Sequence, residues 1–329
     1  MMELITINLQ LFAEMNTNVT TQTGTGQDLS AENKTFYDMT LIDEAQANLV
    51  HDQFGQKRPI PKNGGKKIEF RKFAALPKAL TALTEGVTPD GKKLEVTAIE
   101  AEVNQYGDYI VQSDVLELTS IDNTIVEATK ILGRQAGLTL DTITRNVLQS
   151  GTNVFYCPKG DGTKVASRTA LDATCKLDVA TLKRVAAFLK KNNAPKIDGS
   201  YVAIIHPYAA HDLMADPEWI DAHKYTTSEN LYEGEIGRIA GIRFVETSEA
   251  FVEGGVYCTL VMGANAYGVT EITGGGLQTI IKQKGSAGTA DPLDQRSSIG
   301  WKAMKTAEIL IDAYLCRIES KSDFDIENN

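Results

Sequence analysis

The stretch SIDNTIVEATKILGRQAGLTLDTITRNVLQSG, residues 120 to 151, carries the strongest secondary-structure signal in the chain. Thr119 with Asp122 matches a capping box at its start, and Gly151 is a natural stop. We therefore expect one helix over 120–150, about 45 Å long. Its apolar residues recur at steps of three or four, as one buried helical face requires: Ile121, Ile125, Ala128, Leu132, Ala136, Leu140, Ile143 and Val147.

The segment before this helix has the pattern of a long β-excursion. GGKKIEFRKF (64–73) predicts one strand, and KLEVTAIEAEVNQYGDYIVQ (93–112) predicts one or two more. Between them, TPDGK (88–92) has the residues of a tight turn. A lone hairpin is only marginally stable in water. We therefore expect this excursion to lie on another copy of the protein.

The N-terminal region has the composition of an arm that needs a neighbour. Residues 13–34 are rich in Thr, Asn, Gln and Gly, and cannot bury enough surface to order themselves. From Met1 to Gln56 there is one basic residue, Lys34, against eight acids, whereas 57–108 holds ten basic residues and seven acids. This asymmetry favours pairing between the two segments, including between subunits. The apolar spacing from Phe36 to Phe54 predicts a short helix.

The chain after residue 177 mixes helices and strands, which makes the fold class α+β. DVATLKRVAAFLKKNN predicts a helix begun by Asp178, YVAIIHP a buried strand stopped by Pro207, and YAAHDLMAD a short helix. The remaining strand regions are GEIGRIAGIRFVET, VYCTLVMGANAYGVTEI, LQTIIK and MKTAEILIDAYLCRIE.

Composition and motifs argue against catalysis. The 329 residues are 42% hydrophobic and carry a net charge of −10, which suits a globular protein that binds DNA weakly and without sequence preference. The four cysteines are widely separated, and His206 and His211 lack the spacing of a helical metal pair. No Gly-x-Ser-x-Gly motif exists, and GGG at 274–276 lacks the rest of a phosphate loop. We expect no enzyme activity, no cofactor, no metal site and no membrane span.

One charged stretch, DPLDQRSSIGWK (291–302), could be an active site or a contact between subunits. No nucleophile, base or metal-ligand set accompanies it, so we favour the contact. Arginine and tryptophan anchor interfaces more often than most residue types.

These parts, in this order, resemble a tailed-phage major capsid protein with the Hong Kong 97 fold. The resemblance covers nearly the whole chain. Its matching segments are LTEGVTPDGK (83–92), NQYGDYIVQSDV (104–115), GEIGRIAGIRFVET (234–247), DPLDQRSSIGWK (291–302) and the opening INLQLFAEMN.

The resemblance implies a role for each part of the chain, and the α+β fold would then divide into six segments. These are an N-terminal arm (1–55), an extended β-hairpin loop (56–112), a peripheral domain (113–174) with a spine helix (120–150), an axial domain (175–270), a peripheral return with the tip loop (271–306) and a C-terminal segment (307–329).

The resemblance also implies partners. Asp291, Asp294 and Arg296 would make intersubunit ion pairs with Trp301 as the buried anchor behind them, and Glu85, Lys92 and Lys93 would contact neighbours from the extended loop. The chain would form hexameric and pentameric capsomers, meet a portal protein and enclose double-stranded DNA in a virion capsid, after synthesis in the host bacterial cytoplasm.

The sequence leaves three alternatives open. The short arm favours a separate scaffolding protein over a cleaved scaffold segment, and no Lys–Asn pair for a covalent cross-link is identifiable. An encapsulin-type nanocompartment shell shares the fold and would enclose a cargo enzyme. A soluble enzyme of unknown class is the second alternative.

Overall fold

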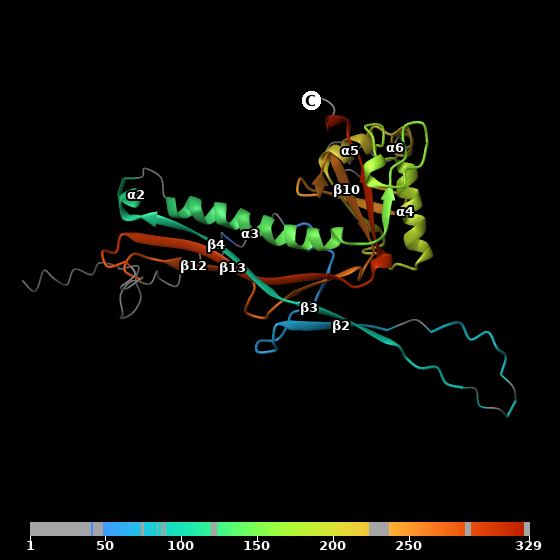
Figure 1. The fold of residues 1–329 in the computed structure, drawn as a ribbon, viewed down its shortest axis with the longest axis horizontal. Helices are drawn as coiled ribbons and strands as arrows, with labels where there is room; N and C mark the ends of the chain where they lie inside the picture. Colours follow the sequence, from blue (N-terminus) through green and yellow to red (C-terminus); the bar gives the residue numbers. More distant parts are fainter. Residues whose placement is uncertain are drawn as a thin grey trace, which may run out of the picture.

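The structure is a computed structural model. It describes residues 41, 49–73, 76–83, 85–86, 88, 90–119, 124–223, 237–286 and 291–325. In this part of the chain a long lobe and a compact lobe lie side by side, and a hairpin projects beneath them (Figure 1). Among the described helices, none combines the length and apolarity that a membrane span requires.

The long lobe is a five-stranded sheet centred on β13. β4 pairs along one edge of β13, and β12 and then β11 pair along the other. β1 extends the sheet by pairing in parallel with β11. The five strands are β1 (Gln56–Lys57), β4 (Asn104–Ser113), β11 (Tyr267–Glu271), β12 (Gln278–Lys282) and β13 (Arg296–Ile309).

Helix α3 (Thr124–Gln149) covers one face of this sheet and confirms the long helix predicted from periodicity. Its apolar face packs on alternate residues of β13, with Leu132 and Ala136 in the same cluster as Ile299 and Trp301. A separate short helix, α2 (Asp114–Thr119), precedes α3 and contains Thr119 of the predicted cap. The Thr119 hydroxyl donates to the Val115 carbonyl inside α2, and Asp122 lies outside the described residues.

The compact lobe has a seven-stranded mixed sheet with helices packed against it (Figure 1). Asp178 caps α4 (Val179–Lys191) by accepting from the Thr181 N–H, as predicted. The predicted strand before Pro207 is β6, and every residue of it is buried. The other elements are β5 (Val154–Tyr156), β6 (Tyr201–Ile205), α5 (Pro207–Met214), α6 (Pro217–His223), β7 (Arg238–Ile239), β8 (Ile242–Glu246), β9 (Val252–Glu253), β10 (Val256–Met262) and β14 (Leu315–Ser320).

The projecting hairpin consists of β2 (Lys67–Phe73) and β3 (Val96–Glu102), paired antiparallel over their whole length. The strand predicted over 64–73 is therefore confirmed, and the pattern over 93–112 forms two strands. The second of these, β4, joins the sheet of the long lobe instead of extending the hairpin. The hairpin and its end thus run over 67–102, a shorter span than the 56–112 expected.

The helix predicted over 36–54 and the turn predicted at 88–92 are not confirmed by the described residues. Residues 49–54 contain no helix, and most of the helix predicted over 36–54 lies outside the described residues. In the loop between β2 and β3, the turn falls at Glu85–Gly86, where Gly86 has a φ of 77°. The described residues of the predicted 88–92 turn have no turn assignment.

Candidate assembly interface

The end of the hairpin exposes apolar side chains that the described part of the chain leaves uncovered. We call residues 73–96 the hairpin end. Phe73 and Val96 face each other where the paired strands stop, and the loop beyond reaches past both lobes (Figure 1). The exposed apolar side chains are Phe73 (58% exposed), Leu76 (57%), Leu80 (86%), Leu83 (76%), Leu94 (61%) and Val96 (49%). So many exposed leucines on one projection indicate a surface that is buried in an assembly.

The base of the hairpin is fixed to the long lobe. The Phe70 ring is buried against Gly268 on β11, where a Cβ atom would come within 2.9 Å of the ring. Only glycine leaves room there for this approach. The Ile60 N–H also donates to the Glu271 carbonyl at 2.8 Å. The hairpin is therefore held at its base and free at its end, as an arm that reaches a neighbour must be.

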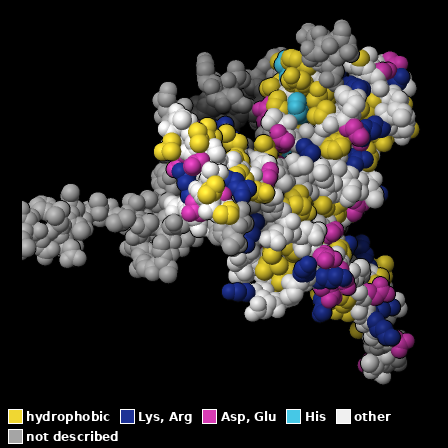
Figure 2. Space-filling view, turned by 60° about the vertical axis from the view of Figure 1, so that its left-hand side comes forward, with side chains coloured by type: hydrophobic (Ala, Val, Ile, Leu, Met, Phe, Trp, Pro, Cys, Tyr) yellow, Lys and Arg dark blue, Asp and Glu magenta, His cyan; other side chains and the backbone are white. Residues whose placement is uncertain are grey.

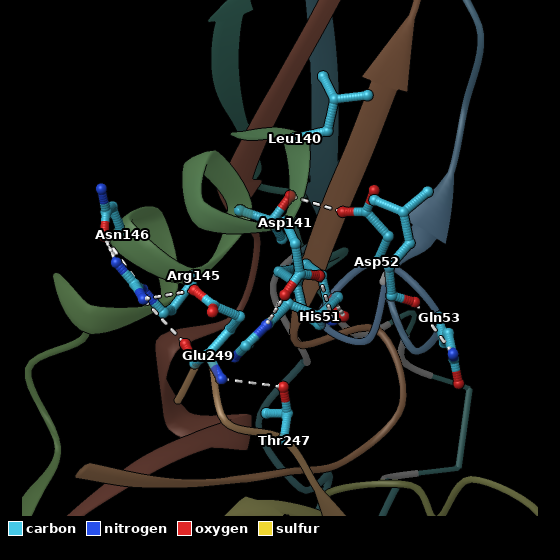
Figure 3. A network of polar contacts seen from close by, with 12 residues as sticks. His51, Asp52, Gln53, Leu140, Asp141, Arg145, Asn146, Thr247 and Glu249 are labelled. Atoms are coloured by element: carbon cyan, nitrogen blue, oxygen red, sulfur yellow. Dashed lines mark hydrogen bonds and ion pairs between the residues drawn. The ribbon is translucent and has the colours of Figure 1, made fainter. Parts of the chain in front are cut away.

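A buried polar cluster lies behind this base (Figure 3). Asp141 of α3 accepts from the His51 backbone N–H at 2.7 Å and lies 2.6 Å from Nδ1 of the same residue. Both side chains are fully buried. The Tyr267 hydroxyl donates to the His51 carbonyl, which adds β11 to the cluster. The chain just before the hairpin is thereby tied to the middle of α3.

The next residue extends this cluster to β13. Asp52 accepts from the Thr144 hydroxyl at 2.6 Å and pairs with Lys305. Lys305 also donates to the Leu140 carbonyl at 3.0 Å. Burial lowers the pKa of Lys305, and the adjacent Asp52 partly offsets this effect. The segment before the hairpin, helix α3 and strand β13 therefore meet at one ion pair whose charged groups are also hydrogen-bonded.

Sequence reasoning missed this cluster, although α3 contained a signal. Asp141 and Thr144 lie next to Leu140 in the apolar face of a helix, where polar side chains need a buried partner. The buried partner of Asp141 is His51. The two lie 90 residues apart, so spacing alone does not identify the pair.

A second exposed apolar surface lies at the other end of the long lobe, around α2. We call it the far-end surface. Figure 2 is turned towards this end, with hydrophobic side chains among charged ones, and the hairpin projects at the lower right. The Asp114 N–H donates to the Gln295 carbonyl and joins α2 to the tip loop. The far-end surface consists of Tyr109 (69% exposed), Val111 (51%), Val115 (62%), Leu116 (46%), Leu118 (80%) and Leu293 (75%).

The charged stretch 291–302 begins at this same end of the lobe. Asp291 is buried, and its carboxylate accepts from the Arg296 backbone N–H at 2.8 Å and lies 3.7 Å from Arg296 Nε. Asp291 therefore closes the loop within its own chain. The Arg296 side chain is 59% exposed, and Asp294 is exposed with a φ of 52°. Glu85, Lys92 and Lys93 are exposed on the hairpin end. The hairpin end projects away from the α2 end of the long lobe, so the structure does not bring these residues near the tip loop (Figure 1).

Trp301 lies inside the long lobe with 3% of its surface exposed. Its Nε1 donates to Gln135 Oε1 at 3.3 Å, and Gln135 Nε2 donates to Asp108 at 2.6 Å. The bond from Gln135 holds the pKa of Asp108 below its ordinary value. One α3 side chain thus ties the helix to β13 and β4.

The described residues include no cluster of His, Cys, Asp or Glu suited to a metal ion. The described residues instead form one projection fixed at its base and two exposed apolar surfaces. These are features of a protein that assembles with other copies. The family model for phage capsid protein matches residues 20–271. The chain belongs to this family. It is a structural major capsid protein of a phage, and neither the nanocompartment nor the enzyme alternative is favoured.

Solved structures agree on the fold. The capsid of cyanophage P-SCSP1u has a TM-score of 0.65 at 15% identity, covering 93% of this chain and 94% of that one. The capsid of cyanophage Pam1 has a TM-score of 0.64 at 12% identity, covering 94% and 98%. The capsid of Helicobacter pylori bacteriophage KHP30 has a TM-score of 0.56 at 13% identity, covering 97% and 100%. The fold is the α+β Hong Kong 97 type. A comparison with curated proteins finds no match.

Proposed function

We propose that this capsid protein builds a closed icosahedral head of a tailed phage by head-to-tail contacts, in which the hairpin end of one copy covers the far-end surface of the next. The observation that carries the proposal is the position of the two apolar surfaces at opposite ends of one chain (Figure 1). A chain with two different complementary surfaces makes heterologous contacts, and these close into rings when the rotation permits. Such rings are the hexameric and pentameric capsomers.

The remaining partners follow from this role. The shell encloses double-stranded DNA without reading its sequence, in keeping with a net charge of −10. A separate scaffolding protein guides curvature, and a portal protein occupies one vertex. Arg296, Asp294, Glu85, Lys92 and Lys93 make rim contacts between subunits. Subunits are made in the bacterial cytoplasm before they enter the virion capsid.

The test is the assembly state of the purified full chain, with and without a co-expressed scaffolding protein. Light scattering coupled to size exclusion and electron microscopy should show rings, capsomers or closed shells. A monomer of 35.8 kDa under every salt and scaffold condition would contradict the proposal. Shells that hold one co-purified enzyme instead of DNA would favour a nanocompartment.

A further inference from the structure

The hairpin end contains a stretch whose sequence has the features of a helix although its described residues, 76–83, are neither helix nor strand. Leu80 and Leu83 are three residues apart, which places them on one face of a helix, and Leu76 lies just before the start of that helix. Each is more than half exposed. In an extended strand the same spacing would put Leu83 on the face opposite to the other two.

The ends of this stretch have helix-boundary residues at the right separation. Pro77 suits the first turn, where its missing N–H is not needed, and it disfavours helical geometry at Leu76 before it. Gly86 has a φ of 77°, the left-handed conformation in which many helices end. The sequence between them, KALTALTE, has neither glycine nor proline and is rich in good helix formers.

Physical chemistry explains why no helix is present in the single chain. A helix of about nine residues is marginal in water, and most helices of this length depend on packing of their apolar face. Among the described residues this stretch lacks such packing, since Leu80 is 86% and Leu83 76% exposed. A strand extension is disfavoured as well, because Pro77 has no N–H for the ladder.

We propose that residues Pro77–Glu85 form an amphipathic helix when the hairpin end docks on a second copy of this chain, with Leu76, Leu80 and Leu83 buried in the contact. This inference rests on the proposed head-to-tail assembly and adds a coil-to-helix transition to it. The partner is a second copy because the far-end surface offers exposed apolar side chains of the matching kind. Folding on contact lowers affinity and makes the contact reversible until the helix is complete.

The test compares alanine with glycine at Thr81, which lies off the leucine face of the expected helix. Glycine is about 1 kcal/mol poorer than alanine inside a helix, which is about five-fold in an equilibrium constant. We expect Thr81→Gly to require about five-fold more subunit for half-assembly than Thr81→Ala. Thr88→Ala and Thr88→Gly are the matched controls beyond Gly86, and these two should assemble alike.

Electron cryomicroscopy of the unmodified shell gives a second readout that does not depend on the variants. Helical density over 77–85 is expected. Shells that form with this stretch extended, or equal alanine–glycine differences at Thr81 and Thr88, would overturn the helix and leave the proposed function intact. Absence of any assembled species from the unmodified chain would overturn both.

Discussion

Asp291 and Arg296 lie five residues apart in one loop, and their side chains have different environments. The Asp291 carboxylate is buried and holds the Arg296 backbone, so its interaction belongs to the subunit. The Arg296 guanidinium is 59% exposed and lies 3.7 Å from that carboxylate. Exposed ion pairs of this kind contribute little to subunit stability. The Arg296 side chain thus keeps more than half of its surface open to solvent, beside a carboxylate that is already bound to the backbone.

Substitutions at these two residues should separate folding from assembly. Arg296→Ala should leave the melting temperature of free subunits unchanged and reduce the yield of closed shells. Asp291→Asn should lower the free energy of unfolding by about 1–2 kcal/mol, because a buried acceptor loses its charge. Asp294→Asn is the control, since asparagine tolerates a φ of 52°. Thermal melting and microscopy measure the two effects; an Arg296→Ala subunit that melts several degrees lower would contradict this assignment.

The buried pair of His51 and Asp141 should be essential to subunit stability. His51→Ala leaves the Asp141 carboxylate buried without its ring partner, so we expect a loss of about 3–5 kcal/mol in the free energy of unfolding. His211→Ala is the matched control, because the His211 side chain is 59% exposed. Denaturant unfolding of both variants decides the matter. Equal stabilities would show that the pair does not anchor the chain before the hairpin.

At the scale of elements, α3 and β13 form the unit that the rest of the long lobe joins. β13 contributes Ile299 and Trp301 to the apolar contact, and α3 contributes Leu132 and Ala136. At the other end of this contact, Lys305 of β13 donates to the Leu140 carbonyl of α3. Their joint stability sets how firmly the hairpin base is held.

Trp301→Ala should cost about 3–5 kcal/mol of subunit stability, since it empties a large site between helix and sheet. Leu293→Ala removes a side chain that is 75% exposed and should leave stability within about 0.5 kcal/mol of the parent. Chemical denaturation of unassembled subunits provides the comparison. A Trp301→Ala subunit as stable as the Leu293→Ala subunit would show that the lobe repacks without the indole.

Periodicity predicted the elements better than their partners. The apolar spacing of α3, the Asp178 cap of α4 and the unbroken apolar run of β6 are local signals, and all three elements formed where expected. The alternation in 93–112 predicts strands but does not say which strand each pairs with. β4 pairs with β13, which lies almost two hundred residues further along the chain. The His51–Asp141 pair depends on the same kind of distant contact.

At the scale of the whole molecule, the hairpin end and the far-end surface cannot reach each other within one chain (Figure 1). A surface that meets itself would give closed dimers, whereas two different surfaces give rings or open chains. The position of the surfaces thus distinguishes the modes of assembly.

Mixing two assembly-deficient variants should give heterodimers. A hairpin variant, Leu80→Asp with Leu83→Asp, keeps its far-end surface, and a far-end variant, Val115→Asp with Leu118→Asp, keeps its hairpin. Each alone should stay monomeric, because burial of the new charges is costly. Light scattering of the mixture should show one-to-one complexes and no rings. Monomers in the mixture, or shells from either variant alone, would contradict the head-to-tail contact.

The central position of β13 in the sheet has a consequence for folding during synthesis on the ribosome. β4 leaves the exit tunnel early, yet its partner strand begins about 180 residues later, which takes roughly 10–40 seconds at about 5–20 residues per second. During that interval the far end of the long lobe lacks its central strand. A nascent chain is therefore unable to present a finished docking surface to its neighbours on the same messenger.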